Sequence, residues 1–140
     1  MREILFRGKR KDNGEWVYGD LVHSQYKIGD TCVGQYGNTV GIHQVDPETV
    51  GQYTWMNDKN GTMIFEGDIV ESQYTQKPYL VCFGEYTYTE EYEYEQEACG
   101  WYNQDINGCI TGFGCPERWA TVIGNIHDNP ELIGGQEDGE

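Results

Sequence analysis

Cysteine, histidine and carboxylate side chains are the groups in this sequence that could bind a metal or carry out nucleophilic or acid–base chemistry. The chain has five cysteines, namely Cys32, Cys82, Cys99, Cys109 and Cys115. No pair of them has the Cys-x-x-Cys spacing of a zinc site, and the three histidines lie outside finger-like offsets. We therefore expect free thiols that act as buried or half-buried small hydrophobic groups, and no bound metal.

The common catalytic and cofactor motifs are missing from the sequence. It contains no GxSxG, HExxH, P-loop or dinucleotide fingerprint. The string Asp58-Lys59-Asn60-Gly61 is too short for a calcium loop, which needs further ligands and a glutamate at its twelfth position. The chain has 24 acidic residues, so some carboxylates will lie close together in any fold. We expect a protein that is not an enzyme and has no cofactor.

Glycine divides the chain into short segments that predict a mainly β fold. There are 19 glycines in 140 residues, and turn-forming pairs such as Asn60-Gly61 recur between short apolar or alternating runs. We expect strands at 2–6, 15–21, 39–43, 51–53, 63–65, 69–72, 79–83 and 120–126. Asp46-Pro47 and Asn129-Pro130 each predict a capped, single-turn helix. The expected core comprises Ile69, Val70, Val81, Phe83, Trp119 and Val122.

Residues 85–97, EYTYTEEYEYEQE, form the most biased segment and predict a long twisted strand or a hairpin. In strand alternation one face carries tyrosines and the other is acidic. Two interpretations follow: a core-facing tyrosine row with a solvated acidic back, or a projecting contact surface. The residues of the candidate contact surface are Tyr86, Tyr88, Glu91, Tyr92, Glu93, Tyr94 and Glu95.

The net charge of −15 argues against binding to nucleic acid or to an anionic membrane. Five of the nine basic residues lie within the first eleven positions. This basic hairpin is either a weak nucleic-acid contact or a solvated turn that protects a strand edge. The apolar run Ile4-Leu5-Phe6 is too short for a signal peptide, and no stretch is long enough to span a membrane. We expect a soluble, cytosolic protein.

Two segments, VGQYTWMNDKNGTMIFEGDIV at 50–70 and VIGNIHDNPELI at 122–133, carry a family resemblance together with the opening REILFRG. They resemble the YopX family of small bacteriophage and prophage proteins. The matching motif residues, to which we assign structural roles, are Gly51, Gln52, Asp58, Asn60, Gly61, Glu66, Gly67, Asp68, Gly124, Asn125, Asn129 and Pro130. Trp55-Met56 replaces the usual Gly-Leu, His127 replaces a common tyrosine, and residues 72–118 match poorly.

The resemblance implies an all-β fold with a small SH3-like barrel and an additional β segment, a phage origin and no established function. We expect one domain over 1–133, divisible into a sub-module 1–45 and a barrel 46–133, with a flexible acidic tail at 134–140. The leading functional hypothesis is a non-enzymatic interaction module that binds a phage or host protein and can form homo-oligomers. The alternative is an acidic mimic that occupies a nucleic-acid-binding protein.

Overall fold

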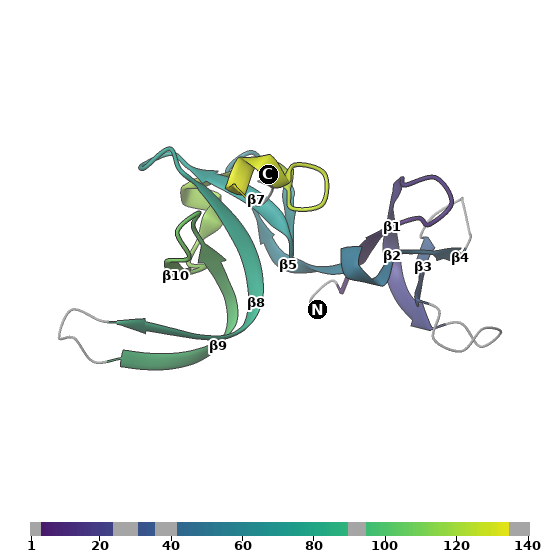
Figure 1. Ribbon diagram of the computed structural model, residues 1–140, viewed down its shortest axis with the longest axis horizontal. Helices are drawn as coiled ribbons and strands as arrows, with labels where there is room; N and C mark the ends of the chain where they lie inside the picture. Colours follow the sequence, from purple (N-terminus) through teal and green to yellow (C-terminus); the bar gives the residue numbers. More distant parts are fainter. Residues whose placement is uncertain (1–3, 24–30, 36–41, 90–94, 135–140) are drawn as a thin grey trace. The chain divides into compact units, whose positions relative to one another are not determined.

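The computed structural model describes residues 4–23, 31–35, 42–89 and 95–134, which form β-strands, turns and short 3₁₀ helices (Figure 1). The predicted all-β class is confirmed. By its internal contacts the chain divides into two units, Met1–Trp55 and Met56–Glu140. In the described residues, no helix is both long and apolar enough to cross a membrane. Six residues of the expected tail, 135–140, lie outside the described part of the chain.

The first unit is built on antiparallel pairs in the order β4-β3-β2-β1-β5. The strands are β1 (Phe6–Lys9), β2 (Trp16–His23), β3 (Thr31–Gln35), β4 (Ile42–Gln44) and the beginning of β5 (Gly51–Asn57). Val17, Val33 and Val45 form its buried cluster. Gly8 lies against this cluster, because a Cβ atom there would come within 2.9 Å of Val45. The predicted turn at Pro47 is the 3₁₀ helix η1 (Pro47–Thr49), capped by Asp46.

The second unit contains an antiparallel sheet in the order β10-β9-β8-β7-β11. Its strands are β7 (Asp68–Ser72), β8 (Pro78–Thr89), β9 (Glu95–Gln104), β10 (Ile110–Gly112) and β11 (Ala120–Asn125). The short strand β6 (Met63–Phe65) neighbours β5, and the 3₁₀ helices are η2 (Pro116–Arg118) and η3 (Pro130–Ile133). Among the described residues, β10 and β11 are the two edge strands of this sheet and do not pair with each other. The expected SH3-like closure is therefore not confirmed.

The core of the second unit follows the predicted apolar positions with one exception. Val70 and Val81 are buried together with other core residues, and Trp119 and Val122 pack against them. Phe83, predicted to be in the core, is 49% exposed. Its ring instead packs on Trp101, with 4.8 Å between the ring centroids, at the point where β8 leaves the sheet. The prediction for Phe83 was therefore wrong.

Several strand boundaries differ from those predicted. β1 begins at Phe6 rather than at residue 2, and Ile4 is 61% exposed. β8 extends to Thr89 rather than ending at Phe83. The sequence also missed β3, β10 and the later part of β9, which have no run of alternating apolar residues to mark them. The hairpin expected as one form of 85–97 is present in part, because 85–89 of β8 pair with 95–99 of β9. The predicted turn at Pro130 is present as η3, but Asn129 does not cap it with its side chain.

Candidate functional site: a curled two-stranded ribbon

Strands β8 and β9 continue as a two-stranded ribbon after their neighbours end. β7 pairs with β8 only at residues 78–80, and β10 pairs with β9 only at residues 102–104. The β8–β9 ladder goes on to Thr89 opposite Glu95. Residues 83–89 and 95–101, which we call the β8–β9 ribbon, therefore pair only with each other within the described chain.

A pair of glycines lies at the base of the β8–β9 ribbon. Gly84 is directly opposite Gly100, and their φ angles are +147° and +151°. Side chains with a Cβ rarely adopt such angles, so glycine at both positions permits a backbone path that other residues would strain. The two strands curve together here, and β10 lies on the inner side of the curve (Figure 1).

The two faces of the ribbon differ in chemistry, as the alternation of side chains predicts. Tyr86 pairs with Ala98, and its ring packs 4.8 Å from that of Tyr102, across the glycine pair. Tyr86 therefore lies on the face opposite to the core residue Val81. The other face carries the pairs Glu85–Cys99 and Thr87–Glu97.

Only part of the predicted contact surface can be placed. Glu95 is exposed, and Tyr86 is half-buried against Tyr102 rather than in the hydrophobic core. The backbone of Tyr88 pairs with Gln96 in the ladder. Glu91, Tyr92, Glu93 and Tyr94 lie outside the described residues.

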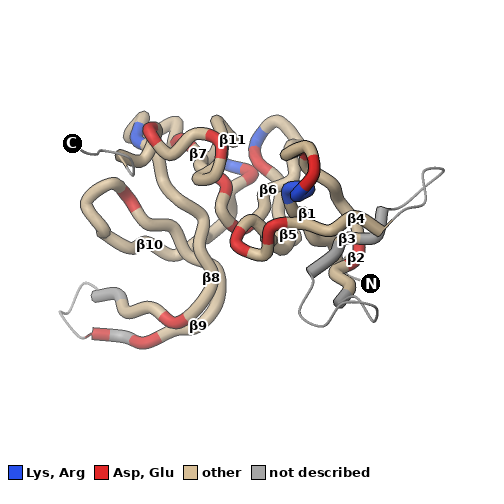
Figure 2. The backbone as a smooth tube through the Cα atoms, turned by 45° about the vertical axis from the view of Figure 1, so that its right-hand side comes forward, with Lys and Arg blue, Asp and Glu red and all other residues tan. Residues whose placement is uncertain are grey.

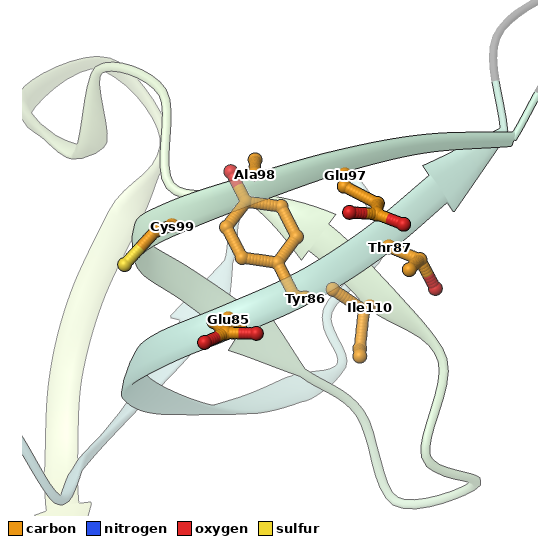
Figure 3. A pocket seen from close by; sticks show the side chains of 7 residues that line it. All are labelled: Glu85, Tyr86, Thr87, Glu97, Ala98, Cys99 and Ile110. Atoms are coloured by element: carbon orange, nitrogen blue, oxygen red, sulfur yellow. The ribbon is translucent and has the colours of Figure 1, made fainter.

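The curl encloses a groove of about 720 Å³ (Figure 3). Its lining consists of three consecutive residues from each ribbon strand and one from β10: Glu85, Tyr86, Thr87, Glu97, Ala98, Cys99 and Ile110. Figure 3 shows the Tyr86 ring directed toward Ala98 and the Glu97 carboxylate beside Thr87. The groove thus combines an aromatic ring and aliphatic groups with two carboxylates, and no basic side chain is among its described lining.

The negative charge of the chain is concentrated in the second unit. The first unit has six basic and seven acidic residues, whereas the second has three basic and 17 acidic residues. Residues 78–117 include eight acidic side chains and no lysine, arginine or histidine. Figure 2 shows the described acidic positions along β8 and β9. A partner of the ribbon would therefore meet a strongly negative surface.

The basic N-terminal hairpin has partners within its own unit. Arg10 donates two hydrogen bonds to the carboxylate of Asp12, at 2.9 and 2.7 Å. This contact lowers the pKa of Asp12 and raises that of Arg10. Arg7 is buried and lies 4.6 Å from the ring centroid of Trp16, with Lys9 at 5.7 Å from the same centroid. These cations serve internal contacts, which leaves less charge for phosphate binding.

Asp58, the first residue of the DKNG motif, connects its own turn to β11. Its carboxylate accepts hydrogen bonds from the amides of Asn60 and Thr62, both at 2.9 Å. Its second oxygen accepts one from the amide of Val122, also at 2.9 Å. Gly61 completes the turn with a φ of +85°. These contacts join the DKNG turn to β11.

The motif near the C-terminus joins β11 to η3 by close packing. A Cβ atom on Gly124 would lie 2.6 Å from Oδ1 of Asn129 and 3.0 Å from Leu132. Oδ1 of Asn129 accepts a hydrogen bond from the amide of Asn125. Oδ1 of Asn125 in turn accepts from the amides of His127 and Asp128. Because Gly124 has no Cβ atom, Asn129 can come close enough to accept the hydrogen bond from Asn125.

The thiols are more exposed than expected. Among the cysteines whose side chains are described, Cys99, Cys109 and Cys115 are exposed, and Cys82 is half-buried. Burial raises the pKa of Cys82, while a hydrogen bond with Tyr102 acts in the opposite direction. The expectation that the cysteines serve as buried small hydrophobic groups was wrong for the three exposed thiols. They lie in the ribbon and in turns, where little apolar surface covers them.

Two glycines in the sequence are a signal for the bend that forms the groove. Gly84 directly precedes the Tyr/Glu segment 85–97 and Gly100 lies three residues after its end, each next to an aromatic residue. Isolated glycines within strand patterns mark bends or close backbone approaches. Ile110 had no such signal, because its place in the groove depends on the curl bringing β10 and the ribbon together.

These features define an all-β protein with an acidic, curled two-stranded ribbon. The chain matches the YopX protein family over residues 5–134 and belongs to that family. It is similar in fold to the crystal structure of protein EF1440 from Enterococcus faecalis, with a TM-score of 0.51 and 20% identity. The match covers 95% of this chain and 99% of that one. No curated protein matches the sequence.

Proposed function

We propose that this protein is a non-enzymatic, phage- or prophage-encoded interaction module that binds a phage or host protein in the bacterial cytoplasm through the β8–β9 ribbon. The observation that carries the proposal is the length of the ribbon beyond its neighbours. Seven cross-strand pairs, from Phe83 opposite Trp101 to Thr89 opposite Glu95, extend past the last pairs with β7 and β10. Isolated two-stranded hairpins are only marginally stable and offer open strand edges to other chains.

The charge supports a protein partner over a nucleic acid or a membrane. The second unit carries three basic and 17 acidic residues, and polyanions would be repelled by it. Tyrosine rings with an acidic surround suit contacts with basic protein surfaces. Contact between the acidic faces of two ribbons would bring like charges together, which favours a different protein as the partner of these faces.

Removal of the outer part of the ribbon tests the proposal. Replacement of residues 87–97 by Asn-Gly leaves Tyr86 and Ala98, which pair in the ladder, flanking a two-residue turn. Wild type and this shortened variant serve as tagged baits in a nuclease-treated lysate of a prophage-carrying host, with captured proteins identified by mass spectrometry. We expect a reproducible partner that wild type captures and the shortened variant does not.

A variant that loses two carboxylates outside the groove provides a control for this experiment. Glu71 and Glu117 are exposed and lie outside the groove, so Glu71→Gln/Glu117→Gln should retain the partner. Near-ultraviolet circular dichroism checks that every bait is folded. Capture of the same proteins by wild type and the shortened variant, or of none by wild type at low salt, would refute the interaction-module proposal.

A second candidate function, an acidic mimic of nucleic acid, is favoured by the forty residues 78–117 that contain no basic side chain. It predicts a basic nucleic-acid-binding protein as the partner, binding that weakens steeply with salt, and displacement by DNA. Replacing Glu91, Glu93 and Glu95 by glutamine should weaken such a complex. Unchanged binding of this triple variant would exclude the mimic while leaving the interaction module intact.

A further inference from the structure

We propose that the open edge of β8 pairs with the same edge of a second copy of this chain, antiparallel and centred on Tyr86. This pairing joins two β8–β9 ribbons into one continuous sheet around a twofold axis. The inference goes beyond the proposed function and does not depend on it. It follows from the backbone groups at this edge, from the order of its side chains and from the carboxylates on the opposite edge.

Every second residue of β8 directs its backbone amide and carbonyl away from β9. The carbonyl of Val81 accepts a hydrogen bond from the amide of Gly67 at 2.9 Å, on the side of β7. Because this direction alternates along a strand, the odd-numbered positions of 83–89 direct their backbone groups to the same side. Within the described residues, no strand lies beside β8 there. Such an edge is a template for another strand.

The two edges of the ribbon are not equally protected. The edge of β9 carries Glu95 and Glu97, which are both exposed. Charged side chains on an edge strand hinder its pairing with another chain. The edge of β8 has a single carboxylate, Glu85, within 83–89, and it continues as Tyr-Thr-Tyr-Thr, residue types that favour strands. The edge of β8 is therefore the one that is open to a further strand.

One register makes the edge of β8 complementary to itself. In an antiparallel pair centred on Tyr86, Glu85 lies opposite Thr87 of the second copy, and Thr87 lies opposite the Glu85 of that copy. A threonine hydroxyl can donate a hydrogen bond to a carboxylate, and no two carboxylates are opposite each other. The register uses all of 83–89 and ends before the position where Gly67 occupies the edge.

The backbone pattern agrees with this register. Glu85 and Thr87 both direct their backbone groups to the open edge, so each can exchange two hydrogen bonds with the other across the twofold axis. Tyr86 then forms the closer, non-hydrogen-bonded pair with its own copy, and aromatic residues directly opposite each other stabilise a sheet. A centre at Glu85 would place two carboxylates opposite each other, and a centre at Thr87 would pair only 85–89 of the described strand.

Edge pairing keeps much of the negative charge away from the contact. Glu95 and Glu97 lie on β9, on the far side of β8 from the second copy. The chain still has a net charge of −15, so long-range repulsion opposes dimerisation until salt screens it. The dimer should therefore become tighter as salt is added, whereas a complex with a basic protein becomes weaker.

Sedimentation equilibrium of the whole protein tests the inference, at about 0.05 M and about 0.5 M salt. We expect a monomer–dimer equilibrium whose dissociation constant falls severalfold at the higher salt concentration. Thr87→Pro removes an amide that faces the open edge and spares the β8–β9 ladder, so it should weaken the dimer at least about tenfold. The matched control is Cys99→Pro on the outer edge of β9, which should change the constant less than about twofold. Odd positions of β9 face that outer edge, because Asp105 donates to the carbonyl of Cys109.

A second pair of variants keeps the test independent of proline. Thr87→Glu places a carboxylate opposite Glu85 of the second copy and should weaken the dimer, whereas Thr87→Gln has a similar size without the charge and should weaken it less. Near-ultraviolet circular dichroism checks that each variant is folded.

Cysteine crosslinking tests the register. In a background where the three exposed thiols are replaced by serine, Tyr86→Cys should form a disulfide between two copies under mild oxidation. At the centre of the pair the two Cα atoms lie about 4.5 Å apart, within the range of a disulfide. Thr87→Cys in the same background should not crosslink to itself, because it lies opposite Glu85. Peptide mapping by mass spectrometry identifies the bond.

Four outcomes would overturn the inference. They are a wild-type monomer at both salt concentrations, equal weakening by Thr87→Pro and Cys99→Pro, crosslinking at position 87 in place of 86, and a dimer that persists in the shortened variant. The last would assign the contact to another surface of the chain. The proposed function is judged separately, because failure of a dimeric wild type to capture a partner would refute that function alone.

Discussion

The carboxylate of Asp58 accepts a hydrogen bond from the amide of Val122, which is 64 residues further along the chain. The same carboxylate accepts from Asn60 and Thr62 within its own turn. One buried side chain therefore folds the turn between β5 and β6 and holds β11 against it. Such a contact links two segments that are distant in sequence but carry the family motifs.

Replacing Asp58 by alanine should destabilise the protein by about 3 kcal/mol or more, because buried amides lose a charged acceptor. The control is Asp105→Ala, since Asp105 accepts from the amides of Asn107 and Cys109 within its own exposed turn. Its expected cost is about 1 kcal/mol. Urea denaturation measures both, and equal losses would show that the bond to Val122 adds nothing.

Alanine in place of glycine usually stabilises a strand, but at Gly84 and Gly100 we expect it to destabilise the protein. Gly84→Ala and Gly100→Ala should each cost about 1–2 kcal/mol and shift the Tyr86 ring from Tyr102, because alanine resists φ angles of +147° and +151°. Gly112 is the matched control, since its φ is ordinary and a Cβ there meets no atom within 4 Å. Nuclear Overhauser contacts between the two rings and urea midpoints report the outcome. Retention of the ring contacts in Gly84→Ala would contradict a curl set by glycine.

Trp55 has a φ of +73°, in the left-handed region that favours glycine. It stands where the family pattern has glycine, and its side chain is 50% exposed. Alanine normally stabilises a strand more than glycine does, but here we expect Trp55→Gly to be about 1 kcal/mol more stable than Trp55→Ala. Chemical denaturation of the two variants measures the difference. Greater stability of the alanine variant would show that the backbone relaxes to an ordinary conformation at this position.

Gly124→Ala should destabilise the protein by about 1–3 kcal/mol, because the new Cβ atom would lie 2.6 Å from Oδ1 of Asn129. Asn129→Ala removes the atom that clashes, but also the acceptor for the amide of Asn125. The double variant should therefore cost less than the sum of the two single variants. A double-mutant cycle in urea measures this coupling, and strict additivity would place the strain elsewhere.

The sequence predicted the parts of the fold that local chemistry determines. The DKNG turn, the core positions Val70 and Val81 and the turn at Pro130 follow from apolar runs and from turn-forming residues. The middle of the chain could not be predicted in the same way. β9 and β10 find their places through pairing across the sheet, and Phe83 leaves the core because β8 continues into the ribbon. The groove forms where the curved ribbon lies close to Ile110, and no local sequence pattern connects these two parts of the chain.

The described thiols should differ in reactivity. Cys99, Cys109 and Cys115 are exposed, whereas Cys82 is half-buried and burial raises its pKa above the ordinary value of 9.0. Because the thiolate is the reactive form, iodoacetamide at pH 8 should modify the three exposed thiols first. Peptide mapping by mass spectrometry measures the order, with urea-unfolded protein as the control in which Cys82 reacts like the others.

The raised pKa of Cys82 should also make the stability of the protein depend on pH. Below the unfolded-state pKa, Cys82 is protonated in both states and its contribution is fully present. As the pH rises above about 9, the unfolded chain loses this proton more readily than the native one, so the free energy of unfolding falls. Cys82→Ser should flatten this alkaline decrease in urea titrations, and an unchanged slope would show that another group causes it.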